Sequence, residues 1–293
     1  MKITVFTPTY NRCYIIENLY HSLQKQTFKN FEWIVIDDGS SDGTDLLFDQ
    51  ILREKNDFTI IYEQTSNGGK HRAINRGVKK ATGDLFFIVD SDDYLTDIAL
   101  ERIIYWEKSI PDEDKNLFCG ICGLKGKSFS EHLGTTFEGE FLDITSLERC
   151  NYRISGDKAE VFYTEILRKY PFPEFEGETF ITECVIWDRI AYDNYKLRFF
   201  NEIIYICDYL PDGLSAHSKE LFLKSPQGYG LYIYQSISYG KLKGLQKWTS
   251  YLKYYYSFRE SIPFRKIAKY LHINPIKLWV RLLGLRIFNR LYK

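Results

Sequence analysis

The sequence predicts an α/β fold with a mostly parallel, doubly wound central sheet. Short β-rich runs alternate with stretches whose apolar residues recur at helical spacing, up to about residue 93. Polar clusters follow these β-rich runs, and open α/β sheets bind ligands at the carboxyl ends of their strands. From about Lys219 the alternation disappears, and helices rich in Tyr, Leu and Lys are expected. We therefore expect an α/β domain with a helical C-terminal extension.

Four strands and three helices are expected in the first part of the chain, in strict alternation. The expected strands cover residues 3–9, 31–36, 58–62 and 85–89, with helical patterns between them. Polar clusters adjoin these strands at residues 7–12, 37–40, 67–72 and 90–93. Because parallel strands share one carboxyl edge, chain topology should bring the four clusters together.

The last cluster carries three carboxylates within four positions, at Asp90, Asp92 and Asp93, separated by Ser91. Like charges this close repel, and a divalent cation with a phosphate ligand would relieve the repulsion. The alternative is an acidic turn followed by the N-cap of a helix.

Composition describes a globular protein of 293 residues, 44% hydrophobic. Its six cysteines lack the spacing of a zinc site or a disulfide framework, so a reducing cytoplasm fits best. Cys119 and Cys122 form a C-x-x-C inside an expected strand and are interpreted as core thiols. The chain enters a strand directly after Met1 and Lys2, and no apolar run approaches the ~18 residues that span a bilayer. A cytoplasmic location is expected.

The zero net charge hides a division along the chain. From Lys241 onward there are 13 basic residues and one acidic residue, a net +12, whereas residues 1–240 carry 26 basic and 38 acidic residues, a net −12. Residues 275–293 mix regularly spaced basic residues with bulky aliphatic ones, which predicts a basic amphipathic helix on an anionic membrane surface. The alternative is a helix packed on its own domain. Nucleic acid is a poorer explanation, because the basic residues do not line a groove.

The polar clusters, taken jointly, resemble an inverting family 2 glycosyltransferase of the GT-A fold. The matching stretches are Thr7–Arg12, Asp37–Ser40, Asn67–Gly69 with Ala73–Gly77, and Asp90–Asp93. The resemblance is strong over about the first 100 residues and weaker to about Ser215. It implies a catalytic domain at 1–217, with a nucleotide-sugar half (1–100) and an acceptor and base half (101–217), followed by a basic, aromatic-rich helical region at 218–293.

The resemblance also implies donor-binding roles. The nucleotide pocket would be lined by Thr7, Pro8, Thr9 and Tyr10. Asp38 would accept a hydrogen bond from the pyrimidine ring, and Lys70 would lie near the nucleobase or the phosphates, with His71 a weaker candidate.

In the Asp90–Asp93 motif, which includes Ser91, Asp90 would bind the ribose hydroxyls and Asp92 would ligate Mg²⁺ or Mn²⁺. Asp93 would either assist the metal through water or cap a helix starting near Thr96, and the cap is favoured.

The catalytic base of the family is the Asp of a Glu-Asp pair. Aligning Ile186–Arg189 with the stretch that follows this pair puts Thr182 and Glu183 on it, so Glu183 replaces the Asp. Glu178 and Asp188 remain alternative bases. His217 is a candidate additional metal ligand, and Asp157 and Lys158 are interpreted as a charged surface turn.

The implied function is transfer of a hexose or N-acetylhexosamine, with inversion, from a nucleotide diphosphate sugar to a glycan. UDP is the expected nucleotide, and the basic tail suggests a lipid-linked acceptor in surface polysaccharide assembly, at the inner face of the plasma membrane. A sugar nucleotidyltransferase is an alternative, but Thr7–Arg12 is not its glycine-rich loop. A non-catalytic, membrane-bound scaffold with a vestigial sugar-nucleotide pocket is the other.

Overall fold

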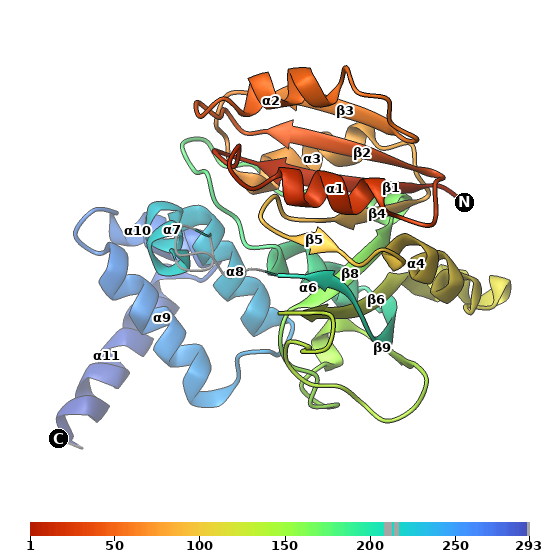
Figure 1. The fold of residues 1–293 in the computed structure, drawn as a ribbon. Helices are drawn as coiled ribbons and strands as arrows, with labels where there is room; N and C mark the ends of the chain where they lie inside the picture. The colour runs from red at the N-terminus through yellow and green to blue at the C-terminus, as the bar shows by residue number, and fades with distance from the viewer. Residues whose placement is uncertain (208–212, 214–216, 292–293) are drawn as a thin grey trace.

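The computed structural model describes residues 1–207, 213 and 217–291 of the chain. An α/β part contains the N-terminus, and a group of helices that ends near the C-terminus lies beside it (Figure 1). The expected strand and helix alternation is confirmed at the N-terminus. Its elements are β1 (Ile3–Thr9), α1 (Glu17–Gln24), β2 (Phe31–Asp37), α2 (Thr44–Ile51), β3 (Thr59–Gln64), α3 (Lys70–Lys80) and β4 (Leu85–Ile88).

The second part of the α/β fold is less regular than the first. Its elements are β5 (Tyr94–Leu95), α4 (Ala99–Lys108), the short 3₁₀ helix η1 (Asp112–Leu117), β6 (Phe118–Gly126), β7 (Leu142–Ile144), η2 (Ser146–Glu148), β8 (Lys158–Tyr163), α5 (Thr164–Lys169), α6 (Cys184–Tyr192) and β9 (Lys196–Ile206). Cys119 and Cys122 are buried free thiols inside β6, which confirms the core interpretation.

The strands form one sheet in the order β3-β2-β1-β4-β8-β6-β9-β5, with β7 paired to β9. The first four strands are parallel, as the βα alternation requires, and β6 is parallel to β9. β8 is antiparallel to both of its neighbours, so it joins the two halves. The carboxyl ends of β1, β2 and β4 therefore lie at one edge of the sheet.

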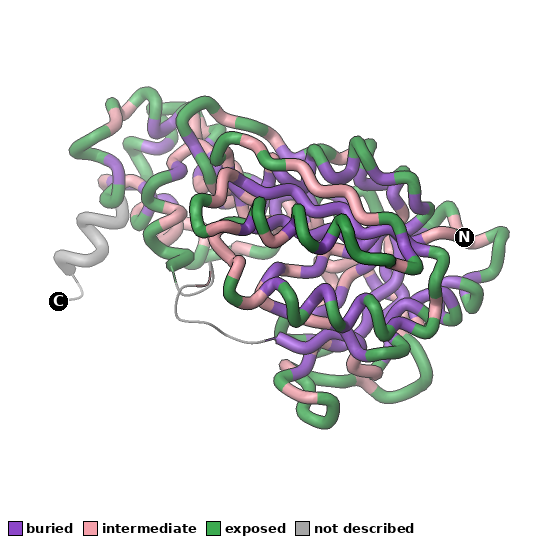
Figure 2. Tube along the Cα trace, turned by 45° about the horizontal axis from the view of Figure 1, so that its top comes forward, coloured by how far each residue is buried: buried purple, intermediate pink, exposed green. Residues whose placement is uncertain are grey.

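Helices cover both faces of this sheet. Along β1, Ile3 and Val5 join a core with α1, α2 and α4, whereas Phe6 points into a second core with α3, α5 and α6. This alternation is the two-residue period of a strand buried on both faces. The tube view shows the buried strands running between half-exposed helices (Figure 2).

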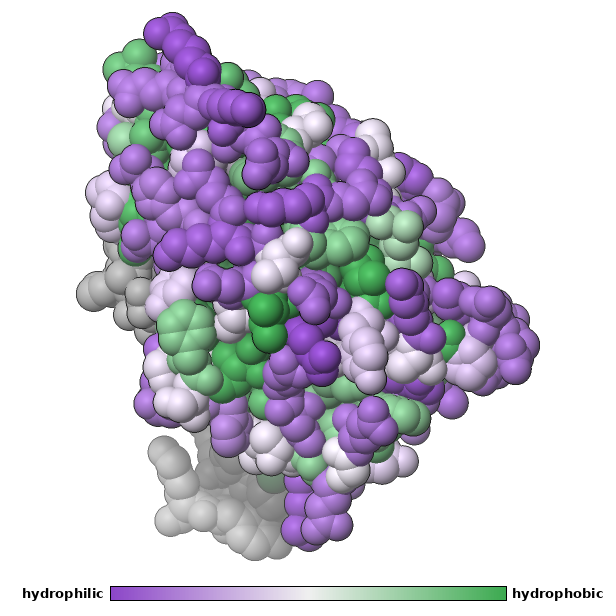
Figure 3. All heavy atoms as spheres, turned by 45° about the vertical axis from the view of Figure 1, so that its right-hand side comes forward, coloured by the Kyte–Doolittle hydropathy of each residue, from purple (hydrophilic) through white to green (hydrophobic). Residues whose placement is uncertain are grey.

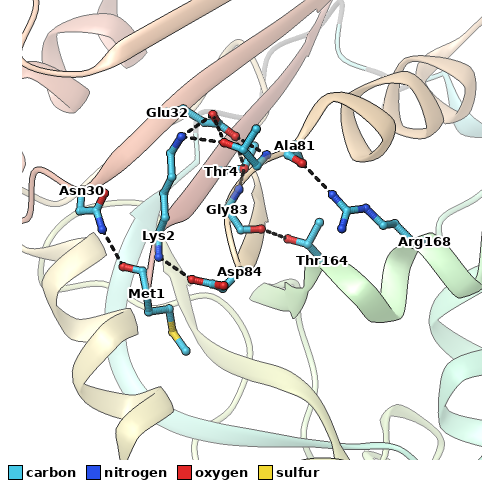
Figure 4. A network of polar contacts seen from close by, with 11 residues as sticks. Met1, Lys2, Thr4, Asn30, Glu32, Ala81, Gly83, Asp84, Thr164 and Arg168 are labelled. Atoms are coloured by element: carbon cyan, nitrogen blue, oxygen red, sulfur yellow. Dashed lines mark hydrogen bonds and ion pairs between the residues drawn. The ribbon is translucent and has the colours of Figure 1, made fainter.

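A network of hydrogen bonds and ion pairs lies at the end of the sheet opposite the polar clusters (Figure 4). The buried Glu32 carboxylate accepts hydrogen bonds from the Lys2 ammonium, the Thr4 hydroxyl, and the backbone N–H and hydroxyl of Thr82, at 2.6 to 2.7 Å. Burial alone would raise the pKa of Glu32, but these donors outweigh it and lower the pKa to about 2. Glu32 thus ties β1, β2 and the start of β4 together.

The C-terminal helices have a hydrophobic core of their own. They are α7 (Ser218–Lys224), α8 (Pro226–Ser238), α9 (Gly244–Phe258), α10 (Phe264–Tyr270) and α11 (Pro275–Leu291). On α11, Leu278 and Leu282 are buried in this core, while Trp279 and Val280 are exposed. Within the described ranges, no helix is long and apolar enough to cross a membrane. The side chains of Arg286, Arg290 and Lys293, which the basic helix was predicted to present, lie outside the described residues.

The molecular surface is mostly hydrophilic on the face seen in Figure 3, with hydrophobic residues gathered in a few groups near its middle. Large side chains that remain exposed include Ile276, Trp279 and Leu245, at 72%, 56% and 64% exposure. All three belong to the C-terminal helices.

Candidate active site

All four polar clusters contribute to one cleft of about 670 Å³ at the carboxyl edge of the sheet. Its described lining includes Pro8, Thr9, Tyr10, Asn11, Arg12, Asp38, Asn67, Gly69, Lys70, Asp90, Ser91, Asp92 and Asp93. The far wall adds Lys125, Asp157, Phe180, Cys207 and Leu221 of α7. The structure therefore brings the expected donor-binding residues together, apart from Thr7, which is buried and accepts a hydrogen bond from the Trp33 indole at 3.0 Å.

Asp37, the last residue of β2, and Asp38, which lines the cleft, both accept hydrogen bonds from the protein itself. Asp37 accepts hydrogen bonds from the Ser40 N–H at 2.8 Å and the Tyr62 hydroxyl at 2.6 Å. Asp38 accepts from the N–H groups of Gly68 and Gly69, both at 2.7 Å. Burial nevertheless raises the pKa of Asp38 above its usual value. Asp38 thus fixes the turn before α3 while one side of it faces the cleft.

Gly69 is required at this turn. Its φ of +96° lies in the region that favours glycine, and a Cβ there would collide with the carbonyl oxygen of Thr179. The turn after β3 and the segment before α6 are therefore in direct contact. Arg72 strengthens the contact, since its guanidinium donates to the carbonyl oxygens of Phe175 and Glu178, both at 2.6 Å.

Lys70, the first residue of α3, lies between two carboxylates from distant parts of the chain. Its ammonium is 2.6 Å from Asp90 Oδ1 and 2.9 Å from Glu183 Oε1. Burial alone would raise the pKa of Asp90, but Lys70 and then Lys125 outweigh it, so this pKa is lowered. Burial would likewise lower the pKa of Lys70, and the two carboxylates raise it instead. Lys70 and Asp90 are therefore both charged at neutral pH.

Asp92 lies farther from its cationic neighbour than Asp90 does. Its Oδ2 lies 3.8 Å from Arg12 Nε, and its pKa is raised by burial and by the neighbouring Asp90. In the part of the chain that the structure describes, no three His, Cys, Asp or Glu side chains could hold a metal ion together. The residues present fit Mg²⁺ or Mn²⁺ held by one or two carboxylates, with phosphate oxygens and water completing the shell.

The favoured capping role of Asp93 is wrong. Helix α4 begins at Ala99 after Ile98, because Tyr94 and Leu95 first form β5 against β9. Asp93 is buried and accepts a hydrogen bond from the Tyr205 hydroxyl at 2.7 Å. Burial and Asp90 raise its pKa to about 7.

Glu178 and Asp188, the alternative bases, have partners in the C-terminal helices. The buried Glu178 carboxylate accepts from the N–H groups of Gln227 and Gly228 at the start of α8, at 2.7 and 2.9 Å. The buried Asp188 lies 2.6 Å from the Lys241 ammonium. Both attach the helical region to the α/β part, and neither of them, nor Glu183, is among the described residues that line the cleft.

The sequence assigned two further residues a role: His217 as a metal ligand and Lys158 as part of a surface turn. His217 lies exposed at the start of α7 and is not among the described residues that line the cleft. Its metal-ligand role stays a prediction. Lys158 was interpreted as part of a surface turn, which is wrong, because it is the buried first residue of β8 and donates to the carbonyl oxygens of Leu133, Thr135 and Ser155.

Sequence reasoning missed Lys125 and Tyr205. The Lys125 ammonium lies 4.0 Å from the centre of the Tyr205 ring, and the Tyr205 hydroxyl accepts from the Asp90 N–H at 2.9 Å. Burial would lower the pKa of Lys125, but Asp90 outweighs it and the pKa is raised. One signal was available: Lys125 is the only charged residue in the otherwise apolar strand Phe118–Gly126.

Residues 4–127 match the model of glycosyl transferase family 2. This part of the chain is a family 2 glycosyltransferase domain. The resemblance of the strand-end motifs to that family is thereby confirmed. The matched residues include β1 to β6 and most of the described cleft.

Known proteins share parts of this chain. A Campylobacter jejuni protein named GalNAc(5)-diNAcBac-PP-undecaprenol beta-1,3-glucosyltransferase is 27% identical over 203 residues, which cover 68% of this chain and 61% of that protein. The chain therefore spans less than two thirds of that relative.

Two solved structures share the fold. Staphylococcus aureus TarS 1-349, in complex with UDP-GlcNAc, aligns with a TM-score of 0.59 at 19% identity, over 97% of this chain and 89% of that one. The mannosyltransferase PcManGT from Pyrobaculum calidifontis, in complex with GDP-Man and Mn²⁺, aligns with a TM-score of 0.56 at 18% identity, over 99% and 87%. These alignments confirm the expected GT-A fold.

Proposed function

We propose that this protein is an inverting glycosyltransferase that moves a hexose or N-acetylhexosamine from a nucleotide diphosphate sugar, with UDP as the nucleotide, to a glycan acceptor. The observation that carries the proposal is the cleft, where Asp90 and Asp92 from the end of β4 lie beside Asp38 and the loop after β1. Nucleotide binding and phosphate neutralisation have candidate groups in this cleft, and Glu183, the candidate for proton removal, contacts Lys70 of its lining.

The donor would occupy the wall built by the N-terminal half. Pro8, Thr9 and Tyr10 would line the nucleotide pocket, and the cleft-facing side of Asp38 would accept from the pyrimidine ring N–H. Asp90 would bind the ribose hydroxyls, beside Ser91. Asp92 would hold Mg²⁺ or Mn²⁺, an ion that neutralises the diphosphate as it leaves.

Glu183 would be the base. As the acceptor oxygen forms its bond to the anomeric carbon, the hydroxyl proton passes to the Glu183 carboxylate. The bond from the anomeric carbon to the phosphate oxygen breaks at the same time, and the nucleotide diphosphate keeps that electron pair. Attack on the face opposite the leaving group inverts the anomeric centre. Glu183 is supported by its contact with Lys70, which also contacts Asp90, whereas Glu178 and Asp188 have partners in the C-terminal helical region.

The test measures release of UDP, with water as the acceptor, from a panel of UDP-sugars in Mg²⁺ and in Mn²⁺. We expect metal-dependent release from one donor, with loss of release but normal UDP affinity in Glu183→Gln. Glu113→Gln, an exposed residue of η1, is the matched control. No release from the full panel with both metals would contradict the enzyme, and normal turnover of Glu183→Gln would move the base elsewhere.

We also propose a lipid-linked acceptor in surface polysaccharide assembly and peripheral attachment to the inner, anionic face of the plasma membrane. The name of the Campylobacter jejuni relative includes a PP-undecaprenol acceptor. The net +12 charge from Lys241 onward and the exposed Ile276, Trp279 and Val280 support membrane contact through α11.

Liposome sedimentation tests this attachment. A Trp279→Gln, Val280→Gln double variant leaves the buried Leu278 and Leu282 in place and should lose binding to vesicles containing phosphatidylglycerol. Leu245→Gln, at an exposed residue of α9, is the control. Undiminished sedimentation of the double variant would contradict a role for α11.

A further inference from the structure

Lys70 contacts two carboxylates that have different roles in the proposed reaction. Its ammonium contacts Asp90, the proposed ribose ligand, and Glu183, the proposed base. The three side chains are 22%, 32% and 35% exposed, so solvent screens them only in part. Without the cation, two partly buried carboxylates would face one another and repel.

Among the described residues, Lys70 is the one cation that pairs with Glu183. Glu183 precedes the first turn of α6, and the helix gives its side chain no capping hydrogen bond within the described structure. A glutamate also has one more rotatable bond than the aspartate of the family pattern. The Glu183 carboxylate therefore needs an external contact to hold it in one place, and Lys70 supplies that contact to Oε1.

The backbone that carries Lys70 is itself held firmly. Gly69 packs against the carbonyl oxygen of Thr179, and Arg72 donates to the carbonyl oxygens of Phe175 and Glu178. These contacts connect the start of α3 to the segment that leads into Glu183. These contacts hold the backbone of Lys70 in place relative to the segment that leads into Glu183.

We propose that Lys70 is a positioning residue that holds the Glu183 carboxylate beside Asp90, so that the acceptor hydroxyl meets Oε2 next to the sugar donor. The inference rests on the proposed function and replaces contact with the nucleobase or phosphates as the principal role of Lys70. Lys70 stays protonated throughout, and the acceptor proton goes to Glu183.

The first experiment compares Lys70→Met with Lys79→Met, an exposed lysine near the end of the same helix. Turnover is measured as UDP release from the donor identified by the panel, and UDP affinity by calorimetry in Mn²⁺. Misplacement of a catalytic group by about 1 Å costs on the order of 10²-fold in rate, so Lys70→Met should lose 10- to 100-fold in kcat, by this rough estimate. UDP affinity should fall by a smaller factor than kcat, because Lys70 also pairs with Asp90, and Lys70→Arg should recover part of kcat.

A loss of UDP affinity as large as the loss of kcat would overturn the proposal and make Lys70 a donor ligand. Thermal unfolding of each variant shows whether it is folded, and Lys70→Gln serves if Lys70→Met is not.

The second experiment is a double-mutant cycle with Glu183→Asp, whose shorter carboxylate withdraws from Lys70. Adding Lys70→Met to that variant should cost less than about threefold, because the contact is already lost. An equal cost in both backgrounds would overturn the proposal. Loss of turnover in Glu183→Gln with full turnover in Lys70→Met would reject only the positioning role. Full turnover in Glu183→Gln would reject the base itself.

Discussion

The acidic loops after β2 and β4 lie on either side of β1 at the same edge of the sheet, yet their carboxylates have different surroundings. Asp37 and Asp38 accept four hydrogen bonds of 2.6 to 2.8 Å from the protein's own N–H and O–H groups. Asp90 instead contacts a lysine, and Asp92 lies 3.8 Å from an arginine. Identical residue types are therefore paired with the protein's own N–H and O–H groups in one loop and lie beside cationic side chains in the other.

The difference lies in how many donors the chain itself provides. Turns rich in glycine and serine follow β2 and β3, and their N–H groups point at the first pair of carboxylates. After β4, the chain pairs Tyr94 and Leu95 with β9 instead, so few backbone donors reach Asp92. A carboxylate without its own donors is destabilised by burial, and a bound cation relieves that cost.

The largest expected effect comes from Asp92→Asn. Removal of one negative charge from the loop after β4 should lower metal-dependent UDP release by about 10²- to 10³-fold, as with other groups that act on charge in the transition state. The free energy of unfolding should stay within ~0.5 kcal/mol of the wild type, because little of the protein depends on this carboxylate. Turnover assays and urea unfolding measure the two quantities. A stable Asp92→Asn variant with full activity would contradict a ligand role for the loop after β4.

The next effect concerns Glu32, whose carboxylate has even more donors than those of Asp37 and Asp38. Its pKa is about 2 in the folded protein and 4.5 in its ordinary state, so the folded protein gains stability above pH 4.5. The free energy of unfolding rises with pH here, because a carboxylate pKa that is lower in the folded protein favours the ionised, folded state. This stability, about 3 kcal/mol, is lost as pH falls from 4.5 towards 2.

Urea unfolding across this pH range measures the loss. Glu32→Gln should be less stable at pH 7 and should have a flatter pH profile below pH 4.5. A profile as steep as that of the wild type would show that other carboxylates dominate acid unfolding.

The smallest effect is expected from Asp37→Ala, which tests the scaffold side of the comparison. Loss of the hydrogen bonds from Ser40 and Tyr62 leaves partly buried donors unpaired and should lower the free energy of unfolding by ~2 kcal/mol. UDP release by the folded variant should stay within about tenfold of the wild type. Asp49→Ala, an exposed residue of α2, is the control and should change stability by less than ~0.5 kcal/mol. Loss of activity without loss of stability would assign Asp37 to the ligand instead.

Most of the N-terminal half could be predicted from sequence because its signals are local. Alternating hydrophobic patterns located β1 to β4 and α1 to α3 within a few residues, and turn residues located the loops. Parallel topology then predicted that the four polar clusters would converge, and the described cleft contains residues of each. Asp93 was assigned wrongly because the residues that follow it gave no local signal for a short strand. That strand, β5, forms by pairing with the distant β9.

The amino-acid sequence by itself determined the fold class, the family of residues 4–127 and the residues that meet at the sheet edge. These follow from periodicity and motif spacing, which the chain carries over short distances. Only the tertiary structure decided which carboxylate contacts which partner: Lys70 lies between Asp90 and Glu183, whereas Glu178 caps α8. Such choices depend on contacts between segments far apart in the chain, where packing and burial select one charge pairing among several that the sequence allows.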